Sequence, residues 1–177
     1  MNAQLRHIVI RMFVTLLILI VLETLASSLF PMFGMSRYRI PFNVLIVLYI
    51  TFKLRTPWIP VMVFLVQWFH SIFTVEGWEM GTIAGIIVAI VVSYAKDLMH
   101  FSSVAITMVL TQVFQCLWVA VIIGLLALKG AENFYLLDKF WRFIPESLIL
   151  SFLSPFLFSI LDKIWASSER GMLGDNG

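Results

Sequence analysis

The chain has 177 residues, of which 61% are hydrophobic and 12% charged, and its formal net charge is +2. Soluble domains carry roughly 45–50% apolar and about 25% charged residues, so this chain lacks the polar groups that a water-exposed surface requires. With its single Cys116, the composition excludes soluble globular, disordered, fibrous and disulfide-stabilised classes and predicts a polytopic membrane protein.

Six apolar segments follow one another and predict an all-α membrane bundle of about six transmembrane helices, in one integral-membrane domain covering residues 1–177. A bilayer-spanning helix needs roughly 17–25 residues. The predicted spans are about 8–30, 40–54, 58–74, 80–95, 103–128 and 144–165, with a polar and aromatic connection over 130–143. The second segment is short, so its length fits either a short span or a re-entrant element.

The first segment could be mistaken for a signal peptide, because Leu25-Ala26-Ser27-Ser28 loosely resembles a cleavage site. Its length and the carboxylate of Glu23 favour a retained span instead. With six spans, seven Lys and Arg residues fall on the side of the termini and five on the other. This weak excess predicts that both termini are cytoplasmic.

Small residues recur at every fourth position of the fourth segment, ending in a carboxylate: Gly81, Gly85, Ala89, Ser93 and Asp97. Such spacing places them on one helix face and lets two backbones approach closely. The stripe fits either packing against a neighbouring helix of the chain or a surface for a partner's transmembrane helix.

Polar side chains form further stripes on the third, fifth and sixth segments, which predicts a bundle with a partly polar interior. The stripes are Gln67, His70, Ser71 and Thr74; Ser103, Thr107, Thr111 and Gln115 with Gln112 beside them; and Ser147, Ser151, Ser154 and Ser159. Those of the fifth and sixth segments could line a pocket.

The ionisable candidates inside or near the spans are Glu23, His70, Asp97 and Glu146. Buried charges in membranes are costly and therefore candidates for function, although a position near a span end lowers the cost. Glu23 lies deeper than the others, and Ser27 one turn later could share its hydrogen-bond network. His70 is more readily interpreted as an interhelical hydrogen-bond donor than as a base.

No motif for catalysis or for cofactor binding accompanies these residues. Gly-x-Ser-x-Gly, His-Glu-x-x-His, the Walker loop and Gly-x-Gly-x-x-Gly are absent, and the three histidines lack ligand spacing. We therefore expect no enzyme, no metal and no cofactor. The internal repeat typical of a carrier is also not evident.

Three segments resemble the rod shape-determining protein MreD family. Residues 39–49 resemble that family's Arg-Pro-Asn/Asp-hydrophobic-Tyr start of the second span, with Ile40 inserted between Arg39 and Pro41. Asp97-Leu98 resembles its Asp-Leu pair, without the expected turn glycine. Residues 153–163 are similar to its final apolar span, which contains a proline, here Pro155.

The resemblance implies a non-enzymatic scaffold of the cell-elongation machinery in the bacterial inner membrane. Expected partners are MreC and, through it, MreB and peptidoglycan synthases, together with the lipid bilayer and no nucleic acid. The family's fold is similar to the S-components of energy-coupling-factor transporters, so a substrate-binding S-component for vitamin uptake is the alternative. The first segment has Ala26 alone and lacks the Ala-x-x-x-Ala pattern of S-components, which favours the elongation machinery.

Arg39, Pro41 and Asn43 stand where the second span starts. Their structural interpretation is an interfacial cation, a proline in the first helical turn and a capping amide. Their functional interpretation is the mouth of a pocket. The aromatic residues Phe134, Tyr135, Phe140 and Trp141 are either depth anchors or a second candidate surface for a partner.

Overall fold

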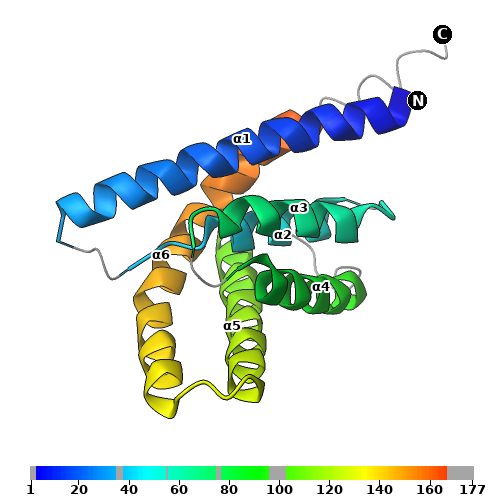
Figure 1. Cartoon of the computed structure of the whole chain (residues 1–177). Helices are drawn as coiled ribbons and strands as arrows, with labels where there is room; N and C mark the ends of the chain where they lie inside the picture. The colour runs from blue at the N-terminus through cyan, green and yellow to red at the C-terminus, as the bar shows by residue number, and fades with distance from the viewer. Residues whose placement is uncertain (1–2, 35–37, 55, 75–76, 96–102, 167–177) are drawn as a thin grey trace, which may run out of the picture.

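The computed structural model describes residues 3–34, 38–54, 56–74, 77–95 and 103–166. Within these ranges all regular structure is helical, which confirms the all-α prediction (Figure 1). The helices are α1 (Ala3–Met32), α2 (Phe42–Lys53), α3 (Ile59–Ser71), α4 (Trp78–Ala95), α5 (Val104–Leu128) and α6 (Asn133–Ala166).

Four of the described helices are long and apolar enough to cross a membrane. They are α1, α4, α5 and α6, through the stretches Arg6–Met32, Trp78–Ala95, Val104–Leu128 and Asn133–Trp165. α2 and α3 have 12 and 13 residues. At a rise of 1.5 Å per residue, both are shorter than a hydrocarbon core of about 30 Å.

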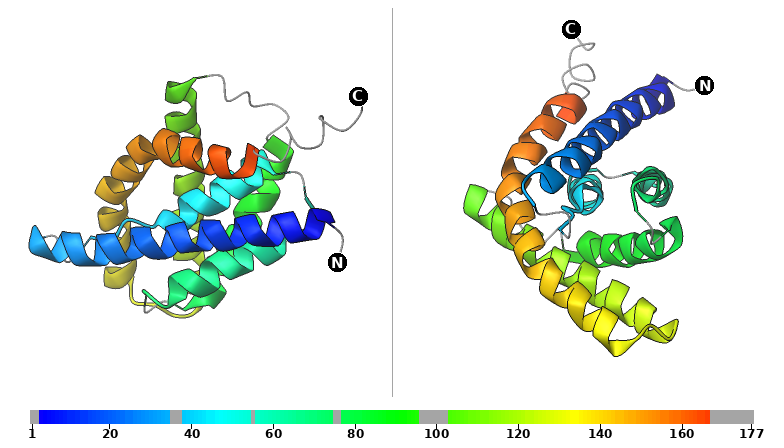
Figure 2. Two further views of the ribbon diagram at one scale, coloured as in Figure 1. Left: turned by 90° about the horizontal axis from the view of Figure 1, so that it is seen from above. Right: turned by 60° about the vertical axis from the view of Figure 1, so that its left-hand side comes forward.

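α2 is the centre of the bundle. Every residue from Phe42 to Phe52 is buried, and α2 contacts each of the other five helices. Figure 2 shows it between α1, α4 and α6. A helix that is apolar around its whole circumference is covered either by lipid or by other protein elements, and here the other five helices cover α2. The short second segment is therefore the part of the chain on which the other helices pack.

The first half of α1 and the end of α6 meet at one end of the bundle. Arg11 donates through Nη1 to the carbonyl of Trp165 at 3.0 Å, and the Trp165 indole donates to Thr15 Oγ1 at 3.2 Å. At the same end, Asp162 accepts from the Tyr49 hydroxyl at 3.1 Å and pairs with Lys53 at 3.3 Å. The connection from α1 to α2 lies at the opposite end (Figure 1).

α5 and α6 form a hairpin that crosses the direction of α1 steeply (Figure 1). The turn between them is short because Gly130, at φ +80°, ends α5. Its N–H donates to the Ala127 carbonyl, and the N–H of Ala131 donates to the Leu126 carbonyl, as in a Schellman motif.

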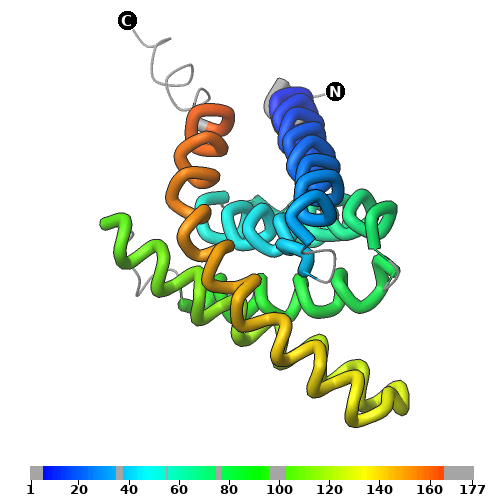
Figure 3. Tube along the Cα trace, turned by 90° about the vertical axis from the view of Figure 1, so that its left-hand side faces the viewer, coloured from blue at the N-terminus to red at the C-terminus, as the bar shows by residue number. Residues whose placement is uncertain are grey.

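The predicted connection over residues 130–143 is wrong, because α6 already begins at Asn133. Its first part is a polar and aromatic helix in which Arg142 pairs with Asp138 one turn earlier at 3.1 Å. Polar residues there suggested a loop, but they alternate with apolar ones at helical spacing. α6 also contains Pro145 and Pro155, and it bends along its course (Figure 3).

A polar seam joins α5 to α6. Ser151 donates to Gln112 Oε1 at 2.7 Å and accepts from Gln115 Nε2 at 3.2 Å, while Gln112 Nε2 donates to Ser147 at 3.0 Å. Thr107, Thr111 and Ser154 are also buried. These contacts confirm the prediction of a partly polar interior.

Candidate functional site

A pocket of about 460 Å³ opens among all six helices and the two connections α1–α2 and α3–α4. Its ionisable and amide-bearing lining residues are Glu23, Arg39, Asn43, Gln67, His70, Gln115, Tyr135, Lys139, Arg142 and Glu146. Trp118, Ile122 and Phe143 add apolar wall. The pocket therefore gathers many of the chain's few ionisable side chains at one place.

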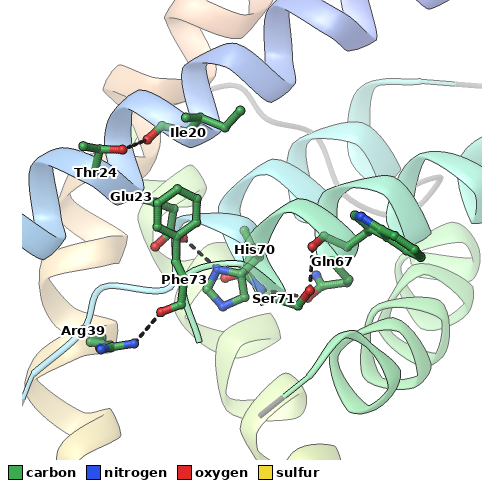
Figure 4. Close-up of polar contacts among 10 residues, drawn as sticks. Ile20, Glu23, Thr24, Arg39, Gln67, His70, Ser71 and Phe73 are labelled. Carbon is green, nitrogen blue, oxygen red and sulfur yellow. Dashed lines mark hydrogen bonds and ion pairs between the residues drawn. The ribbon is translucent and has the colours of Figure 1, made fainter. Parts of the chain in front are cut away.

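Glu23 and His70 form one wall of the pocket. Glu23 Oε1 lies 2.8 Å from His70 Nδ1, and the two side chains are 7% and 17% exposed. Figure 4 shows the contact joining α1 to α3. A buried carboxylate within a span is retained where it has a partner. His70, and not the Ser27 that sequence spacing suggested, partners Glu23.

Asn43 and Gln67 form the deep part of the pocket. Asn43 Nδ2 donates to Gln67 Oε1 at 3.0 Å, which joins α2 to α3. The prediction of a capping amide is wrong: the N-cap of α2 is Pro41, and no side chain caps it. Asn43 instead points inward because the whole of α2 is surrounded by protein, where a buried amide needs a polar partner.

Gly81 makes room for this amide pair. A Cβ at Gly81 would collide with Oε1 of Gln67. One turn later, a Cβ at Gly85 would stand 2.6 Å from Val63 Cγ1 and 3.1 Å from Trp118. The first two positions of the small-residue stripe are thus used for close contacts of α4 with α3 and α5 inside the chain.

Among the described residues of the stripe, only Gly81 lines the pocket. Ala89 is buried and Ser93 is half-buried, and neither lines it; Gly85 does not line it either. Asp97 lies outside the described residues. Pro155 stands within the bent helix α6 and is likewise not a lining residue.

Arg39 joins three parts of the fold at the mouth of the pocket. Its backbone N–H donates to Glu146 Oε1 on α6 at 2.9 Å, and its guanidinium donates to the carbonyl of Phe73, just after α3, at 2.6 Å. Figure 4 shows the second contact. Arg39, Pro41 and Asn43 all line the pocket, so the segment at the start of α2 extends from its surface to its depth.

The sequence did not single out Lys139, Arg142 and Gln67 as pocket residues. Lys139 and Arg142 belong to the segment that the sequence predicts as a connection. In the structure this segment is the first part of α6, and both residues line the pocket together with Arg39 of the α1–α2 connection. Gln67 and Gln115 carried a signal, since each is an amide in an otherwise apolar segment. Among the described residues, no three His, Cys, Asp or Glu side chains come together as metal ligands.

No protein-family model, no curated protein and no solved structure matches the chain.

Proposed function

We propose that this chain is a non-enzymatic scaffold of the bacterial cell-elongation machinery, a multi-pass protein of the inner membrane that binds MreC. One observation supports the proposal most: residues 39–49, on which the resemblance to the MreD family rests, include most of the central helix α2 and five of the residues that line the pocket. Residues at this position contribute both to the packing of the bundle and to the pocket, as expected of a segment that a family shares.

The exposed aromatic residues of α6 supply the candidate contact with the single span of MreC and its flanking segment. Phe134 and Trp141 are 80% and 63% exposed. Aromatic side chains are common at membrane interfaces and at protein contacts. Gly81 and Gly85 are already in contact with α3 and α5, so the aromatic surface is the better candidate for a partner.

In the proposed topology all six helices cross the membrane. The other five helices enclose α2, whereas α3 exposes Val61 and Trp68 on its outer face. Both termini are cytoplasmic, which follows the excess of Lys and Arg on that side. The α1–α2 connection and the mouth of the pocket then face the outside of the cell. Cysteine substitutions at Tyr38 and Phe134, labelled with a membrane-impermeant maleimide in intact cells, test this orientation in a chain whose Cys116 is replaced by Ala.

Depletion of the chain from its source bacterium tests the proposal. If it serves elongation, rod-shaped cells lose width control and become round while growth on complete medium continues for several generations. Restoration of rod shape by the wild-type gene is the control. Unchanged cell shape after complete depletion contradicts the proposal.

The second candidate is a substrate-binding S-component, and the pocket itself favours it, since a scaffold does not require a cavity of 460 Å³. In that case depletion leaves cell shape unchanged and creates a requirement for a vitamin in the medium. The same depletion culture, grown with and without a vitamin mixture, therefore separates the two functions.

A further inference from the structure

The pocket contains polar atoms whose hydrogen-bonding capacity is unused. Asn43 Oδ1, Gln67 Nε2 and Gln115 Oε1 are buried and have no hydrogen-bond partner within the described part of the chain. The three residues are 4%, 2% and 1% exposed, and all three line the cavity. Buried polar groups in native proteins nearly always have partners. Three unpaired atoms from three helices around one cavity indicate that something else supplies the partners.

The direction of these hydrogen bonds can be worked out from their neighbours. The Ser151 hydroxyl donates its only hydrogen to Gln112 Oε1. Gln115 must therefore be the donor in its bond with Ser151, through Nε2, and its Oε1 is left as an unpaired acceptor. The amides of Asn43 and Gln67 bind each other once. If the oxygen and nitrogen of both amides are exchanged, the bond reverses its direction, but the pair still leaves one unpaired donor and one unpaired acceptor. An occupant must therefore offer both donors and acceptors.

The charged residues near the mouth favour an anion. Arg39, Lys139 and Arg142 line the pocket together with two carboxylates, Glu23 and Glu146. Glu23 is bound to His70, and Glu146 accepts from the backbone of Arg39. Arg142 pairs with Asp138 through Nη2, but its Nε is buried and has no hydrogen-bond partner in the described chain. An anionic acceptor would satisfy it with a charge-assisted bond.

We propose that this pocket binds a small molecule, or a lipid head group, that combines an anionic group with amide or hydroxyl groups. The anion lies at Arg142 near the mouth, and the donors and acceptors reach Asn43, Gln67 and Gln115. The volume of about 460 Å³ lies within the range of roughly 300–1,000 Å³ found for small-molecule sites. The inference does not depend on the scaffold function, because a ligand site can serve either candidate function.

The chemistry is tested with three soluble probes on the full chain in nanodiscs. N-acetyl-L-alanine has a carboxylate and an amide, its methyl ester has only the amide, and hexanoate has only the carboxylate. We expect N-acetyl-L-alanine at millimolar concentration to raise the unfolding temperature more than either of the others. Equal effects of N-acetyl-L-alanine and hexanoate, or no effect of any probe together with no adduct in the mass spectra below, overturn the proposal.

Matched variants separate the site from general stability. Gln115→Leu removes an unpaired acceptor in the pocket, whereas Ser154→Ala removes a buried hydroxyl that donates to the Ser151 carbonyl and is not a lining residue. We expect Gln115→Leu to reduce the probe-induced shift at least twofold and Ser154→Ala to retain it. The double variant Asn43→Leu/Gln67→Leu removes both partners of a buried pair, so no lone amide hinders folding. Equal shifts in all variants contradict the proposal.

Native mass spectrometry of the chain, extracted with its own membrane, identifies the source of the ligand. A bound mass of a phospholipid that the Arg142→Gln variant loses assigns a lipid head group, and a smaller mass lost in the same way assigns a soluble molecule. A bound segment of another protein, or an adduct that all the variants retain, argues against this site as proposed. The depletion experiment tests the scaffold function, and the mass spectra test the ligand site. Neither result determines the other, so the two proposals can fail separately.

Discussion

Glu23 on α1 and His70 on α3 place Oε1 and Nδ1 2.8 Å apart, within the hydrophobic part of the bundle. α1 shows little difference in hydrophobicity between its faces, so apolar packing alone does not define which face meets α3. A buried polar pair can define it, since a rotated helix would leave both groups unpaired. Glu23, unexplained by sequence alone, therefore supplies one of the polar contacts that fix the orientation of the first helix, together with those of Arg11 and Thr15.

A double-variant cycle on Glu23 and His70 measures this contact. Either Glu23→Leu or His70→Leu alone leaves the other polar group buried without its partner. We expect each substitution to lower the free energy of unfolding by about 1–3 kcal/mol. The variant with both substitutions should lose less than the sum, by about 0.5–3 kcal/mol. Urea unfolding in detergent micelles, followed by tryptophan fluorescence, measures all four proteins. Strict additivity would show that the two groups do not interact.

The glycines of α4 and α5 form a second, internally controlled test. Gly81→Ala and Gly85→Ala place a methyl group against Gln67 and against Val63 and Trp118, and overpacking of this kind costs about 1–3 kcal/mol. Gly124→Ala on α5 meets nothing within 4 Å and should be neutral or gain up to about 1 kcal/mol of helix propensity. The same unfolding assay compares them. A Gly85→Ala variant as stable as Gly124→Ala would mean that α4 does not pack closely.

The α5–α6 seam gives a third prediction. Ser151→Ala removes a hydroxyl that bonds both Gln112 and Gln115, and we expect a loss of about 0.6–2 kcal/mol, as for other hydrogen bonds between membrane helices. Ser159→Ala, at an exposed position of the same helix, is the control and should change stability by less than about 0.5 kcal/mol. Thermal unfolding in nanodiscs reads both. Equal stability of the two variants would refute a role for the seam.

The aromatic residues of α6 give a prediction about the partner. The double variant Phe134→Ala/Trp141→Ala should lower the recovery of MreC at least threefold in affinity purification and leave the unfolding temperature within 2–3 °C, because exposed side chains contribute little to folding. Phe152→Ala, also on α6 and 71% exposed, is the control and should retain MreC. Undiminished recovery by the double variant would place the contact on another surface.

The sequence was sufficient for the existence and order of six helices and for the polar faces, although not for the start of α6, because these features follow from local periodicity. The amides and hydroxyls of α5 and α6 recur one turn apart along each helix. In a membrane helix such side chains face other helices, where they find hydrogen-bond partners, so their burial could be predicted. The glycines of α4 could be placed on one face, but sequence could not tell which neighbour they meet. That depends on the order in which six helices pack, a property of the whole bundle.

The sequence placed Arg39, Pro41 and Asn43 at the mouth of a pocket, but it could not show which other residues complete the lining, for the same reason. Its residues come from α1, α2, α3, α4, α5, α6 and two connections, and no spacing along the chain relates Glu23 to His70 or Arg39 to Glu146. The start of α6 was misplaced because a mixed polar and aromatic segment fits an interfacial loop and a partly buried helix equally well. This error removed Lys139 and Arg142 from the expected site.

Affinity purification of the epitope-tagged wild-type chain from membranes of its source organism, under mild detergent, tests the central claim most directly. The proposed scaffold function predicts that MreC is recovered with the chain in near-equal amount, and that a tagged, unrelated multi-pass protein of the same membrane does not recover it. Recovery of a transporter's ATPase and its membrane-embedded partner, with MreC absent, would contradict the scaffold function and assign the chain to uptake.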